Sequence, residues 1–194
     1  MERSAAMALS VSNAALIRGM TPSEVEVLGR AHALAMEPRL EAVDDDHHPA
    51  YLHPGRTMLV LLQDVGTVSI TALCAAAVHE SEDRNLRLGS AAVRGALGDP
   101  VADIVDALPL PGDPRLLEQL VTLAPEPLLA ALAERLDHLR HAHLREDPDW
   151  WRAIHEEATR VWVPVAERAH SRLADRYHHW LRTFGRRLDK RAEV

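Results

Sequence analysis

Three short stretches of this chain together offer two histidines and several carboxylate side chains. They occupy residues 51–54 (YLHP), 79–83 (HESED) and 132–136 (LAERL), in or beside segments that favour helix. Imidazole and carboxylate together are ligands of hard or borderline divalent cations. If the fold brings these stretches together, they predict a metal site suited to phosphate-ester hydrolysis. If it does not, the chain is an ordinary helical domain.

A hydrolytic metal site needs a few protein ligands, an open position for water, and a carboxylate that orients or deprotonates that water. Glu82 and Asp83 follow the adjacent pair His79-Glu80 closely enough to take the last role. Glu134 and His138 are four residues apart and therefore share one face of a helix. The chain has 12 histidines, so a single histidine near a carboxylate indicates little by itself.

Composition favours a helical protein with one core. The chain has 194 residues, 47% of them apolar and only 4% aromatic, which suits a single domain and helix rather than strand. The net charge of -7 argues against a general nucleic-acid binder, which needs excess basic charge. It does not exclude a small phosphorylated substrate, because a metal ion and local arginines can dominate a site.

The chain carries features of a cytoplasmic protein. Its single cysteine, Cys74, cannot form an intrachain disulfide, which fits a reducing compartment. The first residues lack the basic start and unbroken apolar run of a signal peptide. No segment approaches the roughly 20 apolar residues of a spanning helix, so we expect no membrane partner.

The pattern of apolar residues and breakers predicts an all-α fold without strand pairs. We expect helices over 21–36, 54–66, 69–79, 89–97, 99–108, 115–123, 125–144, 149–162 and 165–188, with a polar loop at 37–50. The first helix should stop before Pro38, and His53 should stand at the entrance of the next. We expect one domain over 21–190, preceded by an extension or helix over 1–20. The last helix could pack on the core, which is the usual outcome, or on a second subunit in a homo-oligomer.

In their order along the chain, these stretches resemble the HD-type hydrolase domain of the RelA/SpoT family, which includes the small alarmone hydrolases. His53-Pro54 looks like the family's HP motif, and residues 75–83 (AAAVHESED) look like its apolar helix ending in HD and followed by ED. Residues 132–140 (LAERLDHLR) are similar to the LADRLHNMR motif, and 161–168 (VWVPVAER) to the YAPLAHRLG segment. The resemblance spans about residues 28–184. It implies a single-domain, all-α, manganese-dependent enzyme that removes the 3′-pyrophosphate from guanosine tetra- and pentaphosphate.

The resemblance also implies roles for individual residues. The implied Mn²⁺ ligands are His53, His79, Glu80 and Glu134. Glu82 and Asp83 would orient the attacking water. The candidate substrate contacts are Arg56, Arg84, Arg135, His138 and Arg140. The arginines are chosen because guanidinium suits bidentate phosphate binding. His138 is chosen because it replaces the family's asparagine. The expected partner is a small nucleotide.

The chain departs from the family in ways that leave two functions open. Its motifs read HE rather than HD and AER rather than ADR, and each change lengthens a carboxylate side chain by one methylene. The longer side chains could hold a displaced ion, or they could mark an HD domain that binds a nucleotide or a protein partner without hydrolysis. Basic residues before the HP motif are missing, and aspartates 44–46 occupy that neighbourhood. A purely structural helical module is a third alternative.

Overall fold

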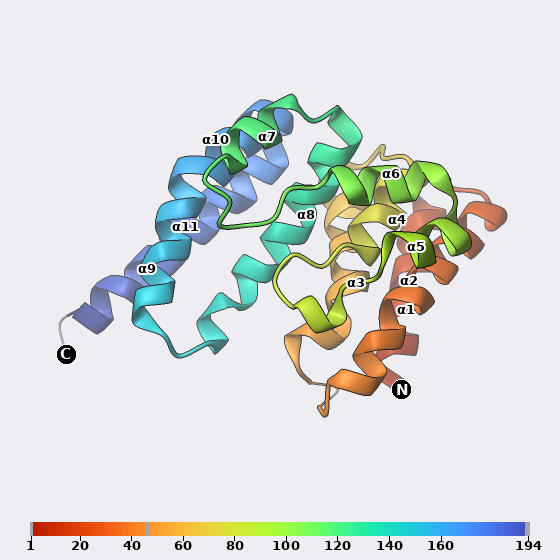
Figure 1. Ribbon diagram of the computed structural model, residues 1–194, viewed down its shortest axis with the longest axis horizontal. Helices are drawn as coiled ribbons and strands as arrows, with labels where there is room; N and C mark the ends of the chain where they lie inside the picture. The colour runs from red at the N-terminus through yellow and green to blue at the C-terminus, as the bar shows by residue number, and fades with distance from the viewer. Residues whose placement is uncertain (1, 46, 193–194) are drawn as a thin grey trace.

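The computed structural model describes residues 2–45 and 47–192, and within them the regular structure is entirely helical (Figure 1). This confirms the predicted all-α class. Asp46, one of the three loop aspartates, lies outside the described residues. The α-helices are α1 (Glu2–Ile17), α2 (Pro22–Ala42), α3 (Pro49–Val60), α4 (Ile70–Val78), α5 (Ser90–Leu97), α6 (Asp99–Ala107), α7 (Leu116–Thr122), α8 (Pro125–His141), α9 (Pro148–Glu157), α10 (Val163–Ala169) and α11 (Ser171–Ala192).

Helix α8 lies at the centre of the molecule. Helices α3, α4 and α6 pack against it from one side, and α10 and α11 from the other (Figure 1). Nine residues of α8 are buried, among them Glu134, Arg135 and Asp137. Since charged side chains are rarely buried without partners, these three mark α8 as the element around which a polar site is built.

Helix α4 is the most completely buried element that contacts α8. Every residue from Ala72 to Val78 is buried, as its apolar sequence predicts. Ser69 caps the helix by accepting a hydrogen bond from the amide of Ala72. The helix ends at Val78 with His79 as its C-cap, and so it brings the His79–Asp83 stretch to the side of α8.

Helix α1 belongs to the same core as the rest of the chain. Val11 and Ala15 are buried, and the helix packs on α2 and α3. Arg18, just after it, donates hydrogen bonds to the carbonyl oxygens of Leu62 and Gln63. Residues 1–20, expected as an extension or helix, thus contain a helix that covers α3.

Two prolines that were expected to stop or start a helix lie inside helices, and the predicted boundaries were wrong there. Helix α2 continues through Pro38 to Ala42, and α3 begins at Pro49 and continues through Pro54. A proline removes one backbone hydrogen bond and crowds the preceding turn. In α2, the buried Arg39 next to this proline donates hydrogen bonds to the carbonyl oxygen of Ala35 in the same helix and to that of Ala50 in α3. His53 therefore sits in the second turn of α3 and not at its entrance.

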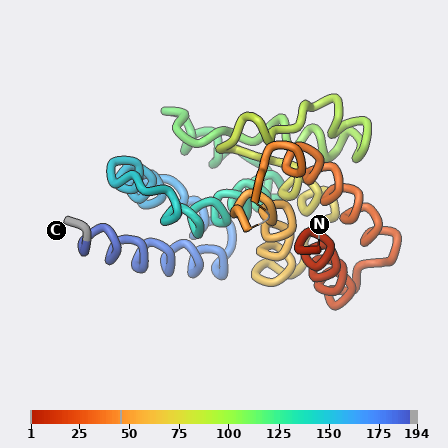
Figure 2. Tube along the Cα trace, turned by 90° about the horizontal axis from the view of Figure 1, so that it is seen from below, coloured from red at the N-terminus to blue at the C-terminus, as the bar shows by residue number. Residues whose placement is uncertain are grey.

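The chain's last predicted helix is in fact two helices, α10 and α11, which are separated at His170. Helix α11 extends along one edge of the molecule (Figure 2). Its aromatic residues Tyr177, Trp180 and Phe184 are buried in the core. The Trp180 and Phe184 rings stack with centroids 4.7 Å apart. Core packing, the expected default, is what this helix shows.

Within the described residues, no helix combines the length and the apolar character that crossing a membrane requires.

Candidate metal centre

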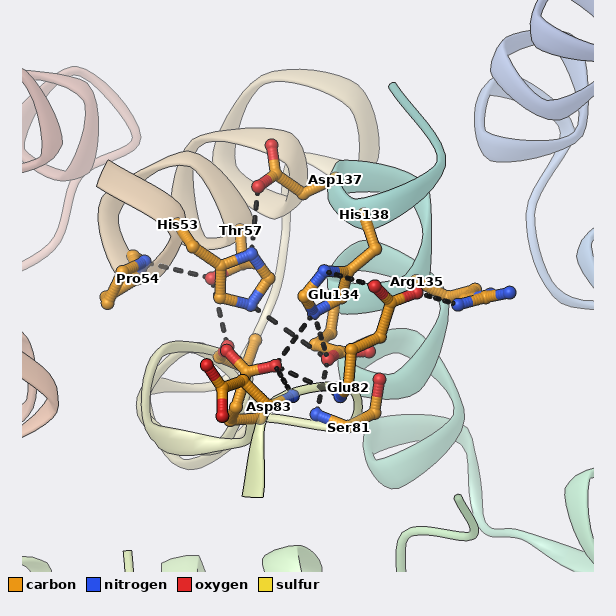
Figure 3. Close-up of polar contacts among 12 residues, drawn as sticks. His53, Pro54, Thr57, Ser81, Glu82, Asp83, Glu134, Arg135, Asp137 and His138 are labelled. Atoms are coloured by element: carbon orange, nitrogen blue, oxygen red, sulfur yellow. Dashed lines mark hydrogen bonds and ion pairs between the residues drawn. The ribbon is translucent and has the colours of Figure 1, made fainter. Parts of the chain in front are cut away.

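Three side chains from α3 and α8 converge where these helices meet the end of α4. His53, Glu134 and His138 each offer one ligand atom, and these atoms all lie within 4.8 Å of one another. Figure 3 shows the two imidazole rings facing each other beside the Glu134 carboxylate. Their ring centroids are 4.4 Å apart. This group could hold a metal ion, and it includes two of the four predicted ligands, His53 and Glu134.

The orientation of His53 is set by Asp137. Nδ1 of His53 lies 2.8 Å from Oδ2 of Asp137, so a hydrogen bond there places the ring proton on Nδ1. Arg56 donates two hydrogen bonds to the same carboxylate. The other nitrogen, Nε2, is then an acceptor that is turned toward Oε1 of Glu134, 4.0 Å away. A carboxylate behind a histidine is the usual support of a metal-binding imidazole.

The Nε2 atom of His53 has no hydrogen-bond partner among the described residues, although the side chain is 1% exposed. A buried nitrogen without a partner costs stability. Nε2 of His138 is also buried without a well-aligned hydrogen bond among the described residues, although it lies 2.9 Å from Oε1 of Glu134. Two buried ring nitrogens without proper hydrogen bonds, directed at one carboxylate, are what a metal ion would satisfy.

The charges of this group are strongly coupled. Burial alone would lower the pKa of His138, but the carboxylates of Glu134 and Glu80 raise it well above its usual value. Burial alone would raise the pKa of Glu134, yet the neighbouring histidines, His138 first, lower it. Without a metal, a proton on His138 thus balances the carboxylates, and a divalent cation would take over that role.

Glu80 is held by other protein groups. Its Oε2 lies 2.7 Å from the guanidinium of Arg39, and its Oε1 accepts hydrogen bonds from the amides of Glu82 and Asp83. His138 lies 3.2 Å from the same Oε1. Burial raises the pKa of Glu80, but His138 and His53 outweigh it and lower the pKa to about 2. The side chain is ionised and has an arginine partner, and its predicted role as a metal ligand stays a prediction.

His79 stands at the carboxyl end of α4 and is 6% exposed. Burial is the main reason that its pKa is lowered, and it is therefore a neutral imidazole at pH 7. That is the form that binds metals. His79 is outside the group of three converging ligands, but Glu134, Glu80 and His53 are close enough to influence its charge. Its ligand role also stays a prediction.

A pocket of about 440 Å³ opens over this group. Its walls come from the start of α3, the 80–83 stretch, the end of α8 and the start of α9. They are His48, Pro49, Ala50, His53, Arg56, Glu80, Glu82, Asp83, Asp137, His138, His141, Ala142, Leu144, Arg145 and Trp150. The volume lies within the range of small-molecule sites, roughly 300–1,000 Å³. The predicted water-orienting residues, Glu82 and Asp83, both line it.

The arginines that were predicted to bind substrate do not all lie at the same pocket. Arg56 lines the pocket, whereas Arg84 lines a second, neighbouring pocket. Arg135 is buried between the carboxylates of Glu82 and Glu157, and Figure 3 shows it turned away from the two imidazoles.

Arg140 lines neither of these two pockets. Burial lowers its pKa, and the charges that act on it most are those of Asp137, Arg176 and Asp64. Of the predicted arginines, Arg56 is the one brought to the candidate metal centre.

Arg39 and Asp137 are site residues to which sequence reasoning assigned no role. Asp137 had a detectable signal, because it lies three residues after Glu134 and shares its helix face. Arg39 had none, because it was expected in a loop after Pro38. His48, His141 and Trp150 of the pocket wall are also recognisable only in the fold.

Comparisons with models of known protein families and with curated protein sequences give no match for this chain.

Proposed function

We propose that this protein is a metal-dependent phosphohydrolase that acts on a nucleotide. The observation that carries the proposal is the convergence of His53, His138 and Glu134, with the two imidazoles lining the pocket of about 440 Å³. Three protein ligands with an open coordination position are the arrangement of catalytic zinc and related hydrolytic sites. In this proposal His53, Glu134 and His138 form the ligand set, and His79 and Glu80 lie close enough to complete it.

The donor set suits Mn²⁺ or a similar cation, because imidazole and carboxylate share the coordination shell and no thiolate takes part. When bound, such an ion polarises a phosphoryl oxygen and lowers the pKa of a water molecule. The residues of the chain would do the rest. The Asp137 carboxylate holds Nδ1 of His53 and so aims Nε2 at the site, and the amide of Ser81 donates a hydrogen bond of 2.9 Å to Oε1 of Glu134.

Glu82 is the best-placed group to accept the proton of the attacking water. Its Oε2 lies 3.5 Å from Nδ1 of His138, and its Oε1 is anchored by Arg135. The side chain is half-exposed and lines the pocket, so it can reach both a water molecule and solvent. Asp83 uses Oδ1 to cap the amide of Asn85 and lines the same pocket, where it would help to orient the water.

The proposed substrate is a guanosine tetra- or pentaphosphate, from which the enzyme removes the 3′-pyrophosphate. This follows the resemblance to the RelA/SpoT hydrolase domain, and the pocket wall is compatible with it. Arg56 and Arg145 offer positive charge for a phosphate group, and Trp150 offers a flat apolar surface for a base.

A second function is favoured by one contact, the ion pair between Arg39 and Glu80. An arginine takes the place that a cation would have beside this carboxylate, and it satisfies the charge without a metal. The alternative is therefore a domain that binds the nucleotide or a protein partner without hydrolysis.

The test is release of pyrophosphate from guanosine tetraphosphate by the purified protein, with and without Mn²⁺, together with the metal content of the protein. Manganese-dependent release that is lost in His53→Ala and kept in His178→Ala would support the hydrolase. His178 is a matched control because it is exposed and pairs with Glu167 on the surface. Nucleotide binding without release, and without bound metal, would favour the alternative.

A further inference from the structure

Helix α11 has a charge opposite to that of the whole chain. It holds seven of the 22 lysine and arginine residues but two of the 29 aspartate and glutamate residues. The helix runs along one edge of the molecule (Figure 2), and Tyr177, Trp180 and Phe184 bury one of its sides in the core. The net charge of -7 is therefore unevenly distributed, with one basic helix on an otherwise acidic protein.

The exposed basic side chains of α11 form one row on the side of the helix that faces solvent. An α-helix has 3.6 residues per turn, so Arg172 and Lys190 lie about five turns apart on the same side. Arg176 and Arg186 lie within about 40° of the line that joins them, and the row is about 27 Å long. The basic row consists of Arg172, Arg176, Arg182, Arg186, Arg187 and Lys190, all of them exposed.

Most charges of the basic row have no carboxylate partner. Arg176 pairs with Asp64 at 2.8 Å, but the other members have no ion pair within residues 2–45 and 47–192. Nε of Arg186 donates a hydrogen bond to the carbonyl oxygen of Arg182, which carries no net charge. The row therefore presents a positive charge that the described part of the chain leaves largely unbalanced.

Two hollows adjoin the amino-terminal half of the basic row. The first, of about 470 Å³, is lined by Asp64, Arg172, Asp175, Arg176, His179 and Arg182. The second, of about 600 Å³, shares Asp64 and Arg172 with the first and is also lined by Arg18. Arg18 donates hydrogen bonds to the carbonyl oxygens of Leu62 and Gln63, which orient its guanidinium without balancing its charge. The basic surface thus extends from α11 to the residue that follows α1.

The chemistry of this surface favours a polymer of phosphates. Arginine, which makes up most of the row, binds phosphate oxygens in pairs. The length of about 27 Å approaches one turn of a nucleic-acid duplex, about 34 Å. The aromatic rings of α11 are buried, so none of them is free to stack on unpaired bases of a single strand. The apolar side of the helix lies in the core, so it is not free to enter a lipid bilayer.

We infer that α11, together with Arg18, binds the phosphate backbone of a double-stranded nucleic acid. Contacts to phosphates carry no sequence information, so the binding is non-specific in sequence. The acidic remainder of the chain repels the same polymer, which confines the contact to this one face. The surface is separate from the metal pocket, because the two hollows and that pocket have no wall residue in common.

Fluorescence anisotropy of the full-length protein with a labelled duplex of about 20 base pairs tests the inference. Duplex DNA and duplex RNA are measured separately, and the tighter Kd identifies the preferred duplex. We expect a Kd of about 1–100 μM and a plot of log K against log salt with a slope of roughly -4, as four to five phosphate contacts give. Arg182→Gln combined with Arg186→Gln should weaken binding about tenfold and make this slope shallower by about 2. Lysine at both positions keeps the charge and should keep the slope.

Arg94→Gln combined with Arg115→Gln is the matched control. It also removes two positive charges, but from side chains outside α11 that are 40% and 72% exposed, and it should leave Kd and the slope nearly unchanged. Equal weakening by the two pairs of substitutions would overturn the inference, because the net charge alone would then govern binding. The absence of salt-dependent binding to both duplexes at about 50 mM salt would also overturn it. Binding to vesicles of equal parts phosphatidylserine and phosphatidylcholine, without binding to either duplex, would overturn it in favour of a membrane surface.

Discussion

The guanidinium of Arg39 lies 2.7 Å from Oε2 of Glu80, and both side chains are 1% exposed. Arg39 comes from the last turn of α2, beyond the proline that was expected to end this helix. Glu80 follows His79, the C-cap residue of α4, and it lines the metal pocket together with Glu82 and Asp83. The pair therefore ties α2 to the stretch that forms the pocket wall.

Loss of Arg39 should destabilise the protein strongly. Arg39→Met leaves the Glu80 charge buried without its partner, and breaking a buried ion pair costs about 3–5 kcal/mol. The free energy of unfolding from urea titration measures this cost. Combining Arg39→Met with Glu80→Gln should recover a large part of the loss, since both charges are then gone.

Arg94→Ala is the control for this experiment. Arg94 is 40% exposed and pairs with exposed aspartates, so its loss should change stability far less than the loss of Arg39. If Arg39→Met had an effect as small as that of Arg94→Ala, the Arg39–Glu80 pair would not be a structural tie.

Metal binding should depend on His138 as much as on His53. His138→Ala removes one of three converging ligands, and we expect most of the Mn²⁺ to be lost. Elemental analysis after dialysis against Mn²⁺ measures the content, with His178→Ala as the variant that keeps it. Full metal content in His138→Ala would show that His138 is not a ligand.

His79→Ala tests the ligand set that the family resemblance implies. If the His79→Ala variant loses its metal, His79 belongs to the coordination shell together with the three converging residues. Retained metal would instead restrict the shell to the group that the geometry brings together. Because His79 is buried, circular dichroism of the variant should first establish that it is folded.

Asp137→Asn should weaken metal binding without removing a ligand. The amide can still contact His53, but it no longer stabilises the tautomer with its proton on Nδ1, and losses of this kind cost about 10–100-fold in metal affinity. Competition with a coloured Mn²⁺ chelator gives the affinity. Asp149→Asn is the control, because Asp149 is exposed and pairs with Arg152 on the surface. An unchanged affinity in Asp137→Asn would contradict the supporting role.

Cys74 should be inert to thiol reagents in the folded protein. Burial in α4 raises the pKa of its thiol to about 12, so almost none is thiolate at pH 8. A chromogenic disulfide reagent should react only after urea unfolds the chain, and reaction within seconds in the native protein would contradict the packing of α4.

The raised pKa of Cys74 also sets the sign of a pH dependence. The unfolded chain ionises this thiol above about pH 9 and the folded one only near pH 12, so stability is fully present below pH 9 and falls between these values. Cys74→Ala should lose less stability than the unmodified protein between pH 9 and 11, as measured by urea titration.

Much of the helical architecture was predictable, because apolar spacing and capping residues act locally. The buried helix at 70–78 and the breaks at Gly98 and Pro109 lie where the pattern predicted them. The boundaries failed at Pro38 and Pro54. A proline's cost is local, but the contacts of Arg39 and the packing of α3 that offset it come from distant parts of the chain.

The sequence by itself determined which chemical groups are available: the histidines, the carboxylates and their places near helix ends. The tertiary structure decided which of them meet. The packing of α3, α4 and α8 brings His53 to Glu134 and His138 and places Asp137 behind His53. The packing of α2 on α4 pairs Arg39 with Glu80. Ligand distances depend on how helices pack, and helix packing depends on the whole core, which no short motif encodes.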